Sequence, residues 1–144
     1  MDKRWAFRRD IVRKTEGNWS AKNIVHGGAT DSRYGLAGTV SIAHPKAKST
    51  LAGVKIDGDR QDLHRFQVFY QRAPGGGDLL VSTQKKHKTL FTKSETISDA
   101  YYEMIVPEGD SHIYLEAQNA NVIIYGVALE VDTPGVTWET FGVA

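Results

Sequence analysis

The sequence contains no cysteine. A disulfide scaffold, a thiolate zinc site and a cysteine nucleophile are therefore excluded. The chain also lacks an excess of either charge, because 18 Lys and Arg residues balance 17 Asp and Glu residues. This balance gives no general electrostatic reason to bind nucleic acid or an anionic membrane. No apolar run approaches the roughly 20 residues of a membrane span.

Helical periodicity is also missing. Short segments instead alternate apolar and polar residues with the period of two that is typical of strands. They cover residues 51–56, 66–70, 101–106 and 112–117, with a longer apolar strand over 121–131 and another around Trp5 and Phe7. Fourteen glycines supply many turns between them. The sequence predicts one all-β domain over residues 1–144, an antiparallel sandwich or barrel of about eight to nine strands.

Turn-forming residues separate these segments. Asp57-Gly58-Asp59 and residues 107–110 (PEGD) each precede a predicted strand. Residues 74–78 (PGGGD) are typical of a hairpin loop, because glycine permits the backbone angles that tight hairpins need.

Three groups of segments carry a family resemblance. Residues 125–130 (YGVALE), 132–136 (DTPGV) and 138–143 (WETFGV) form the first, residues 69–77 (FYQRAPGGG) the second, and residues 17–20 and 34–38 the third. Their order and spacing resemble the β-sandwich domain that bacterial SGNH (GDSL-type) esterases carry beside or inside the hydrolase.

The resemblance implies an all-β, antiparallel two-sheet jelly-roll sandwich that acts as a non-catalytic accessory domain. Such a domain would bind or position a cell-wall or extracellular polysaccharide for an SGNH hydrolase domain of the same polypeptide, in the periplasm or outside the cell. The nucleophilic serine of that family precedes the matched region and its Asn-Gly follows it, so we expect the chain to be an excised part of a longer protein. A purely structural brace for the hydrolase is the alternative.

One short motif points to a different function. Residues 109–112 (GDSH) spell a Gly-Asp-Ser block, which would make Asp110, Ser111 and His112 part of an ester hydrolase. A nucleophilic serine of this kind needs a strand-to-helix turn, whereas the residues after Ser111 alternate like a strand. We therefore expect a turn there and no catalytic residue in this chain.

A glycan-binding surface is the site that we favour. Sugar rings stack on flat aromatic faces, while their hydroxyl groups bond to fixed polar side chains. The long, glycine-rich loop over 23–34 supplies such groups, so the candidate binding residues are Trp19, His26, Asp31, Arg33 and Tyr34. Trp19 and Tyr34 have an alternative role in packing. Tyr101, Tyr102 and Trp138 are further aromatic candidates.

Two charged clusters complete the inventory. Asp57, Asp59 and Asp62 could offer oxygen ligands to a structural calcium ion, which the jelly-roll resemblance favours, although an acidic turn explains them as well. The basic run over 85–88 (KKHK) is typical of a solvated strand edge, with an acidic polysaccharide as the functional alternative. No other cofactor is expected.

Overall fold

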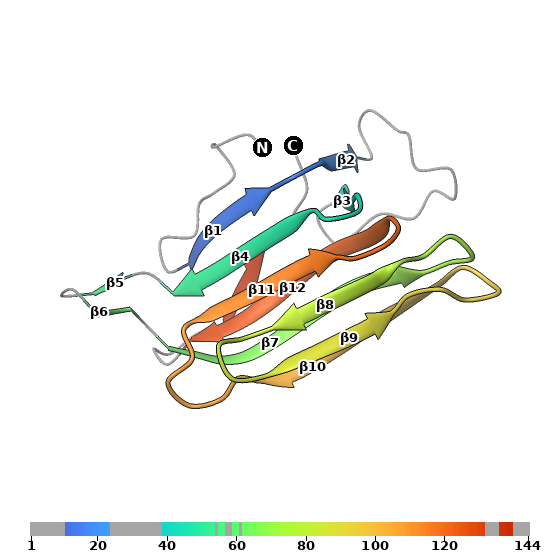
Figure 1. Cartoon of the computed structure of the whole chain (residues 1–144). Helices are drawn as coiled ribbons and strands as arrows, with labels where there is room; N and C mark the ends of the chain where they lie inside the picture. Colours follow the sequence, from blue (N-terminus) through green and yellow to red (C-terminus); the bar gives the residue numbers. More distant parts are fainter. Residues whose placement is uncertain are drawn as a thin grey trace.

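The computed structural model describes residues 11–23, 39–53, 55–56, 59–60, 62–131 and 136–139. All regular secondary structure within these residues is β, and two antiparallel sheets lie face to face (Figure 1). The all-β, two-sheet prediction is therefore confirmed. The strand predicted around Trp5 and Phe7 lies outside the described residues.

The first sheet has the strand order β1-β4-β11-β8-β9. Its strands are β1 (Ile11–Glu16), β4 (Lys48–Gly53), β8 (Asp78–Ser82), β9 (His87–Phe91) and β11 (His112–Ala117). The second sheet has the order β10-β7-β12-β3-β2, with β13 also paired to β12. Its strands are β2 (Trp19–Asn23), β3 (Thr39–Ala43), β7 (Leu63–Arg72), β10 (Ser98–Ile105), β12 (Val122–Val131) and β13 (Val136–Glu139). Strands β5 (Lys55–Ile56) and β6 (Asp59–Arg60) pair with each other on either side of Asp57-Gly58.

The connectivity is that of a jelly roll. Eight strands pair in nested fashion, β3 with β12, β4 with β11, β7 with β10, and β8 with β9. The chain thus follows the path of one long hairpin that is wrapped over itself so that its strands are divided between two sheets. The remaining strands extend the sheets, since β1 pairs with β4, β2 with β3 and β13 with β12.

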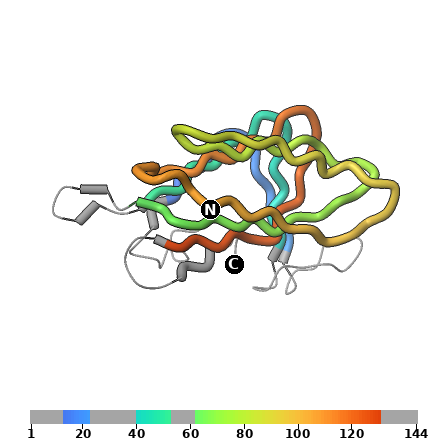
Figure 2. Tube along the Cα trace, turned by 90° about the horizontal axis from the view of Figure 1, so that it is seen from below, coloured from blue at the N-terminus to red at the C-terminus, as the bar shows by residue number. Residues whose placement is uncertain are grey.

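The core lies between the two layers, which Figure 2 shows one above the other. Alternation along β7 turns Phe66, Val68 and Tyr70 inward, and Ile113 and Leu115 of β11 meet them from the other sheet. Burial of each such apolar side chain contributes about 1.5–3 kcal/mol to the free energy of unfolding. The period of two in the sequence therefore has its origin in this one buried face per sheet.

The predicted hairpin over 74–78 and the predicted turn over 107–110 are both crossovers between sheets. Residues 74–77 lead from β7 in the second sheet to β8 in the first, and residues 106–111 lead from β10 to β11 in the same direction. Local turn chemistry specifies a chain reversal but not the sheet that the next strand joins, which is why the hairpin prediction was wrong. Gly77 is needed here for close packing, because a Cβ atom would lie 2.7 Å from the carbonyl carbon of Ala120.

Within the described residues there is no helix with the length and apolarity to cross a membrane.

Candidate functional site

An exposed aromatic residue of the second sheet lies on its outer face. Tyr101 of β10 is 65% exposed and is the register partner of Phe69 on β7, which in turn lies opposite Gly126 on β12. The rings of Tyr101 and Phe69 have centroids 6.1 Å apart and are tilted by 30°. In this row the Tyr101 ring is exposed, the Phe69 ring beside it is half-buried, and Gly126 is buried.

The next row, toward the C-terminal end of β10, is polar. Glu103 lies opposite Gln67, and Gln67 lies opposite Ala128. The Gln67 amide donates a hydrogen bond of 3.5 Å to Glu103 Oε1. One row further, the Arg65 Nε lies 3.4 Å from Glu103 Oε1 and 3.7 Å from Glu130 Oε2. Exposed ion pairs of this kind contribute only about 0–1 kcal/mol each, but they hold the side chains in defined positions.

A shallow pocket of about 100 Å³ opens within this polar region. Its lining residues are Arg65, Gln67, Ala128, Leu129 and Glu130. Because Ala128 is small and its neighbours on the face are long and polar, the pocket has an apolar floor and a rim of hydrogen-bonding groups.

A second polar group flanks the aromatic pair on the other side. The Gln71 amide donates to the Tyr125 hydroxyl at 3.0 Å, and that hydroxyl donates to Asp99 Oδ1 at 2.9 Å. The register of β12 against β7 shifts between Ile124 and Gly126, at an irregularity that includes Tyr125. Such bulges commonly redirect one side chain of a strand toward a functional position.

These rows define the outer-face patch, which consists of Tyr101, Phe69, Gly126, Glu103, Gln67, Ala128, Arg65, Glu130, Gln71, Tyr125 and Asp99. Successive rows are about 7 Å apart along the strands. An exposed aromatic face flanked by amide, carboxylate and guanidinium groups can stack against a sugar and bond its hydroxyl groups.

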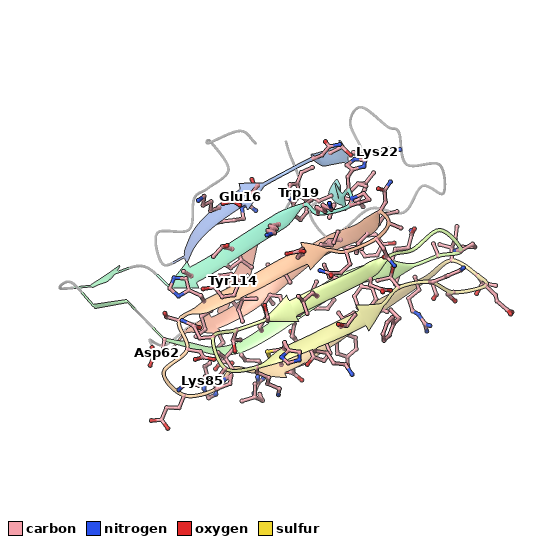
Figure 3. The ribbon with its side chains drawn as sticks, viewed as in Figure 1. Glu16, Trp19, Lys22, Asp62, Lys85 and Tyr114 are labelled. Carbon is pink, nitrogen blue, oxygen red and sulfur yellow. The ribbon has the colours of Figure 1, made fainter. Side chains whose placement is uncertain are left out.

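A smaller aromatic pair lies on the outer face of the first sheet. Tyr114 of β11 is 38% exposed, and its ring stacks on that of His112 with centroids 6.0 Å apart and an interplanar angle of 6°. Figure 3 shows Tyr114 on the middle strand of this sheet. The Tyr114 ring is less exposed than that of Tyr101, so we place the candidate site on the second sheet.

Of the five residues predicted to bind glycan, Trp19 is the one within the described part of the chain. It is partly buried and packs against the core. Its indole Nε1 donates to the carbonyl oxygens of Glu16 and Lys48, both at 3.1 Å (Figure 3). These contacts agree with the packing role left open for Trp19. His26, Asp31, Arg33 and Tyr34 lie outside the described residues, so the loop site stays a prediction.

The Gly-Asp-Ser-His segment links two turns. Ser111 Oγ lies 2.9 Å from His112 Nδ1. The Gln84 amide nitrogen lies 3.1 Å from the same His112 nitrogen, within hydrogen-bonding distance. A serine triad holds its carboxylate against the imidazole, whereas here Asp110 Oδ2 accepts the backbone N–H of Lys85 at 3.3 Å. Asp110 and Ser111 are only 1% and 9% exposed. The contacts tie the turn after β8 to the connection before β11, as expected for a structural segment.

The structure describes the basic run over 85–88 in full, but only part of the acidic cluster of Asp57, Asp59 and Asp62. Among the residues that it covers, no group of three or more His, Asp or Glu side chains could hold a metal ion. The side chains of Asp57 and Asp59 are outside that part, so the calcium site stays a prediction. The basic run begins on the turn between β8 and β9 and continues into β9, which is an edge strand. Exposed lysines on an edge discourage pairing with another chain.

Sequence reasoning named Tyr101 as an aromatic candidate but missed its neighbours on the patch. The signal for Tyr101 was local, because residues 98–105 alternate and an aromatic on an outward position of such a strand is not part of the core. Phe69, Gln67 and Arg65 are more than 30 residues away along the chain, and only the strand register brings them to Tyr101.

The fold and the patch together define an all-β jelly-roll sandwich with an aromatic and polar outer face. No protein-family model matches the sequence, and no curated protein matches it. Among solved structures, the chain is similar to the enzymatically active domain of tailspike protein 4 of bacteriophage CBA120, with 13% identity and a TM-score of 0.36. The alignment covers 91% of this chain and 19% of that chain, so this chain spans about a fifth of its length.

Proposed function

We propose that this chain is a non-catalytic carbohydrate-binding domain that holds a polysaccharide on the outer-face patch. The observation that carries the proposal is the Tyr101–Phe69 pair, an exposed aromatic surface with polar side chains fixed on both sides of it. Exposing this much aromatic surface costs free energy unless a partner covers it, and the C–H face of a sugar ring is a suitable partner.

The polar neighbours provide orientation. Glu103 and Gln67 offer acceptors and a donor on one side of the rings, and Asp99 offers acceptors on the other. Sugar hydroxyl groups both donate and accept, so they match this mixture. Because the patch is open and the contacts are few, we expect weak binding at each site, with dissociation constants from tens of micromolar to millimolar, about 4–6 kcal/mol of binding free energy.

The wider context is part of the proposal. We infer that the domain positions a cell-wall or extracellular polysaccharide for an SGNH-type ester hydrolase domain on the same polypeptide, in the periplasm or outside the cell. The segments over 69–77 and 125–143, which resemble the sandwich domain of such esterases, support this inference.

Affinity electrophoresis tests the binding function. The chain is run through gels that contain hydroxyethyl cellulose, arabinoxylan, galactomannan, laminarin, polygalacturonate or alginate. We expect retardation in at least one gel and about tenfold weaker binding for Tyr101→Ala, since loss of a stacking ring costs on the order of 1–2 kcal/mol.

Phe91→Ala is the matched control. Phe91 is 68% exposed but lies on β9, at the edge of the other sheet, so its removal should leave retardation unchanged. Equal losses in the two variants, or no retardation in any gel, would contradict the proposal. The second result would favour the structural brace, for which the exposed Ile105 next to the patch on β10 would be a contact residue.

A further inference from the structure

Strand β10 is an edge strand without the features that usually keep an edge from pairing. Among the described strands, the paired order of the first sheet ends in β1 and β9, and that of the second sheet ends in β10 and β2 (Figure 1). Strands β1, β2 and β9 each carry a lysine, namely Lys14, Lys22 and Lys88. Strand β10 contains neither lysine nor proline, and its eight residues pair with β7 without a bulge. Because lysine, proline and bulges are what commonly block an edge, β10 is the edge best suited to accept another strand.

The direction of the backbone groups of β10 follows from one hydrogen bond at its end. The Val106 N–H donates to the His64 carbonyl oxygen at 2.9 Å. Along an antiparallel strand, backbone groups point alternately to the two sides of the strand. Residues 98, 100, 102 and 104 therefore direct their N–H and C=O groups toward β7, as Val106 does. Tyr101, Glu103 and Ile105 direct theirs away from β7, and no described strand pairs with β10 on that side.

The side chains along this edge include exposed apolar groups. Tyr101 is 65% exposed and Ile105 is 54% exposed, and both lie on the outer face of the second sheet. A flat edge strand with exposed apolar side chains is a typical site of strand pairing between chains. The edge therefore offers both unpaired backbone groups and apolar surface.

A second copy of the same strand fits β10 in one register. Two copies that lie antiparallel, with a twofold axis at Tyr102, place Tyr101 of each opposite Glu103 of the other and Ile105 opposite Asp99. In this register the outward backbone groups of Tyr101 and Glu103 meet, and each such pair exchanges two hydrogen bonds. Tyr101 of one copy also lies diagonally next to Tyr101 and Ile105 of the other, so the apolar side chains cover one another.

The neighbouring registers are disfavoured by charge. An axis at Tyr101 would place Asp99 of one copy opposite Glu103 of the other. An axis at Glu103 would place that carboxylate opposite its own counterpart. Like charges directly opposite each other destabilise strand pairing, whereas the register centred on Tyr102 has no such pair. The sequence of β10 is therefore self-complementary about Tyr102.

We infer that this chain forms a homodimer by antiparallel pairing of two β10 strands, with the twofold axis at Tyr102. The pairing joins the second sheets of the two copies into one continuous sheet. Because the contact is the same on both copies, it closes at the dimer and does not propagate into a filament. The inference does not rest on carbohydrate binding. Since the strands pair in the plane of the sheet, the two outer-face patches lie side by side in the dimer.

Sedimentation equilibrium of the full chain tests the association itself. The runs cover concentrations from about one to several hundred micromolar, because the population of a dimer depends on protomer concentration. We expect the average mass to reach twice the 16.0 kDa of one chain. A mass that stays at 16.0 kDa over the whole range would overturn the inference.

A proline variant tests whether the contact lies on β10. Ile105→Pro removes an N–H that points away from β7, at an edge position where proline is compatible with the fold. It should weaken association about tenfold or more, because each copy loses a donor to the other and the proline ring crowds the incoming strand.

Phe91→Pro is the matched control on β9. Phe91 is 68% exposed, and its N–H points away from β8, because the N–H of the next residue, Thr92, donates to the Gly77 carbonyl oxygen. This variant should leave association unchanged. A dimer that neither proline variant weakens, or that both weaken equally, would overturn the inference by placing the contact elsewhere.

Disulfide cross-linking tests the register. The chain contains no cysteine, so a single introduced cysteine can cross-link only between two copies. In Tyr102→Cys the two thiols would face each other across the axis, in a non-hydrogen-bonded pair whose Cα atoms lie about 4.5 Å apart, within the range of a disulfide. We expect rapid formation of a cross-linked dimer under mild oxidation, and slow cross-linking of Phe91→Cys.

Equal rates of cross-linking for the two cysteine variants would overturn the inference, because the axis at Tyr102 is part of it. None of these measurements involves a glycan. Their failure would therefore leave the proposed carbohydrate binding standing, and absence of retardation in the affinity gels would leave the dimer standing.

Discussion

Tyr101 and Phe69 are register partners on β10 and β7, and their rings contact each other on the outer face of the second sheet. The residues that flank this pair in the sequence point toward the core or pack against it. They are Val68 and Tyr70 on β7 and Tyr102 on β10. The same alternation that builds the sandwich therefore places this aromatic pair on the outer face of the sheet, where Tyr101 is 65% exposed.

Removal of the Tyr101 ring should weaken ligand binding without unfolding the protein. The ring is 65% exposed, and a cross-strand aromatic contact contributes about 0.2–1 kcal/mol. We expect Tyr101→Ala to lower the free energy of unfolding by less than about 1 kcal/mol in urea denaturation. Phe66→Ala gives the contrast, since that side chain is fully buried and its truncation should cost about 3–5 kcal/mol. Similar costs for the two variants would mean that Tyr101 is a core residue.

Position 77 should tolerate no side chain, whereas position 75, two residues earlier, should tolerate one. A Cβ atom at Gly77 would lie 2.7 Å from the Ala120 carbonyl carbon, but at Gly75 it would meet nothing within 4 Å. Gly77→Ala should therefore reduce the free energy of unfolding by about 1–3 kcal/mol through overpacking of backbone. Gly75→Ala should be neutral or stabilising by up to about 1 kcal/mol, because alanine restricts the unfolded chain. Paired thermal melts of the two variants test this difference.

Stability should fall in alkaline solution in part because of Tyr102. Burial raises the pKa of this phenol above its usual value near 10, since the charged form is poorly solvated next to the core. Below about pH 10 the hydroxyl is neutral in both states and its contribution is complete. As pH rises further, the unfolded state loses its proton first, so the free energy of unfolding decreases.

The matched variant for this effect is Tyr102→Phe, which keeps the ring and removes the ionisable group. The drop in urea midpoint between pH 9 and pH 11 should be smaller in the variant than in the parent. Identical slopes for the two proteins would show that Tyr102 titrates alike in the folded and unfolded states.

Ester hydrolysis by this chain alone should be absent. Ser111 is 9% exposed, and the neighbouring Asp110 carboxylate accepts the Lys85 amide hydrogen. We expect no enzyme-dependent release of p-nitrophenol from p-nitrophenyl acetate above the level given by Ser111→Ala. Turnover that disappears in this variant would identify residues 110–112 as catalytic and contradict the accessory role.

The sequence predicted the two-sheet architecture and the strands β4, β7, β10, β11 and β12, and for a local reason. Segments such as residues 112–117 bury every second side chain, and Ile113, Leu115 and Ala117 are all fully buried as the alternation requires. Such a pattern depends only on which face meets the core, so it can be read along one strand.

The arrangement of the site could not be predicted in the same way. Phe69, Tyr101 and Gly126 meet because three strands far apart in the sequence pair in one register, and a register irregularity on β12 helps to set that row. Hydrogen-bonded pairing and one bulge fix this register, and neither produces a periodic pattern of residues in the sequence. The same limit explains the turn over 74–77, where proline and glycine mark a reversal but do not show that the chain changes sheets.

The most direct test is to map the ligand on the protein. ¹H–¹⁵N correlation spectra are recorded while oligosaccharides prepared from the retarding polysaccharide are added. The proposal predicts shift changes that cluster on β10, β7 and β12 around Tyr101 and are absent from Tyr101→Ala. Changes confined to Tyr114 and β11, or to the basic turn at 85–88, would contradict it.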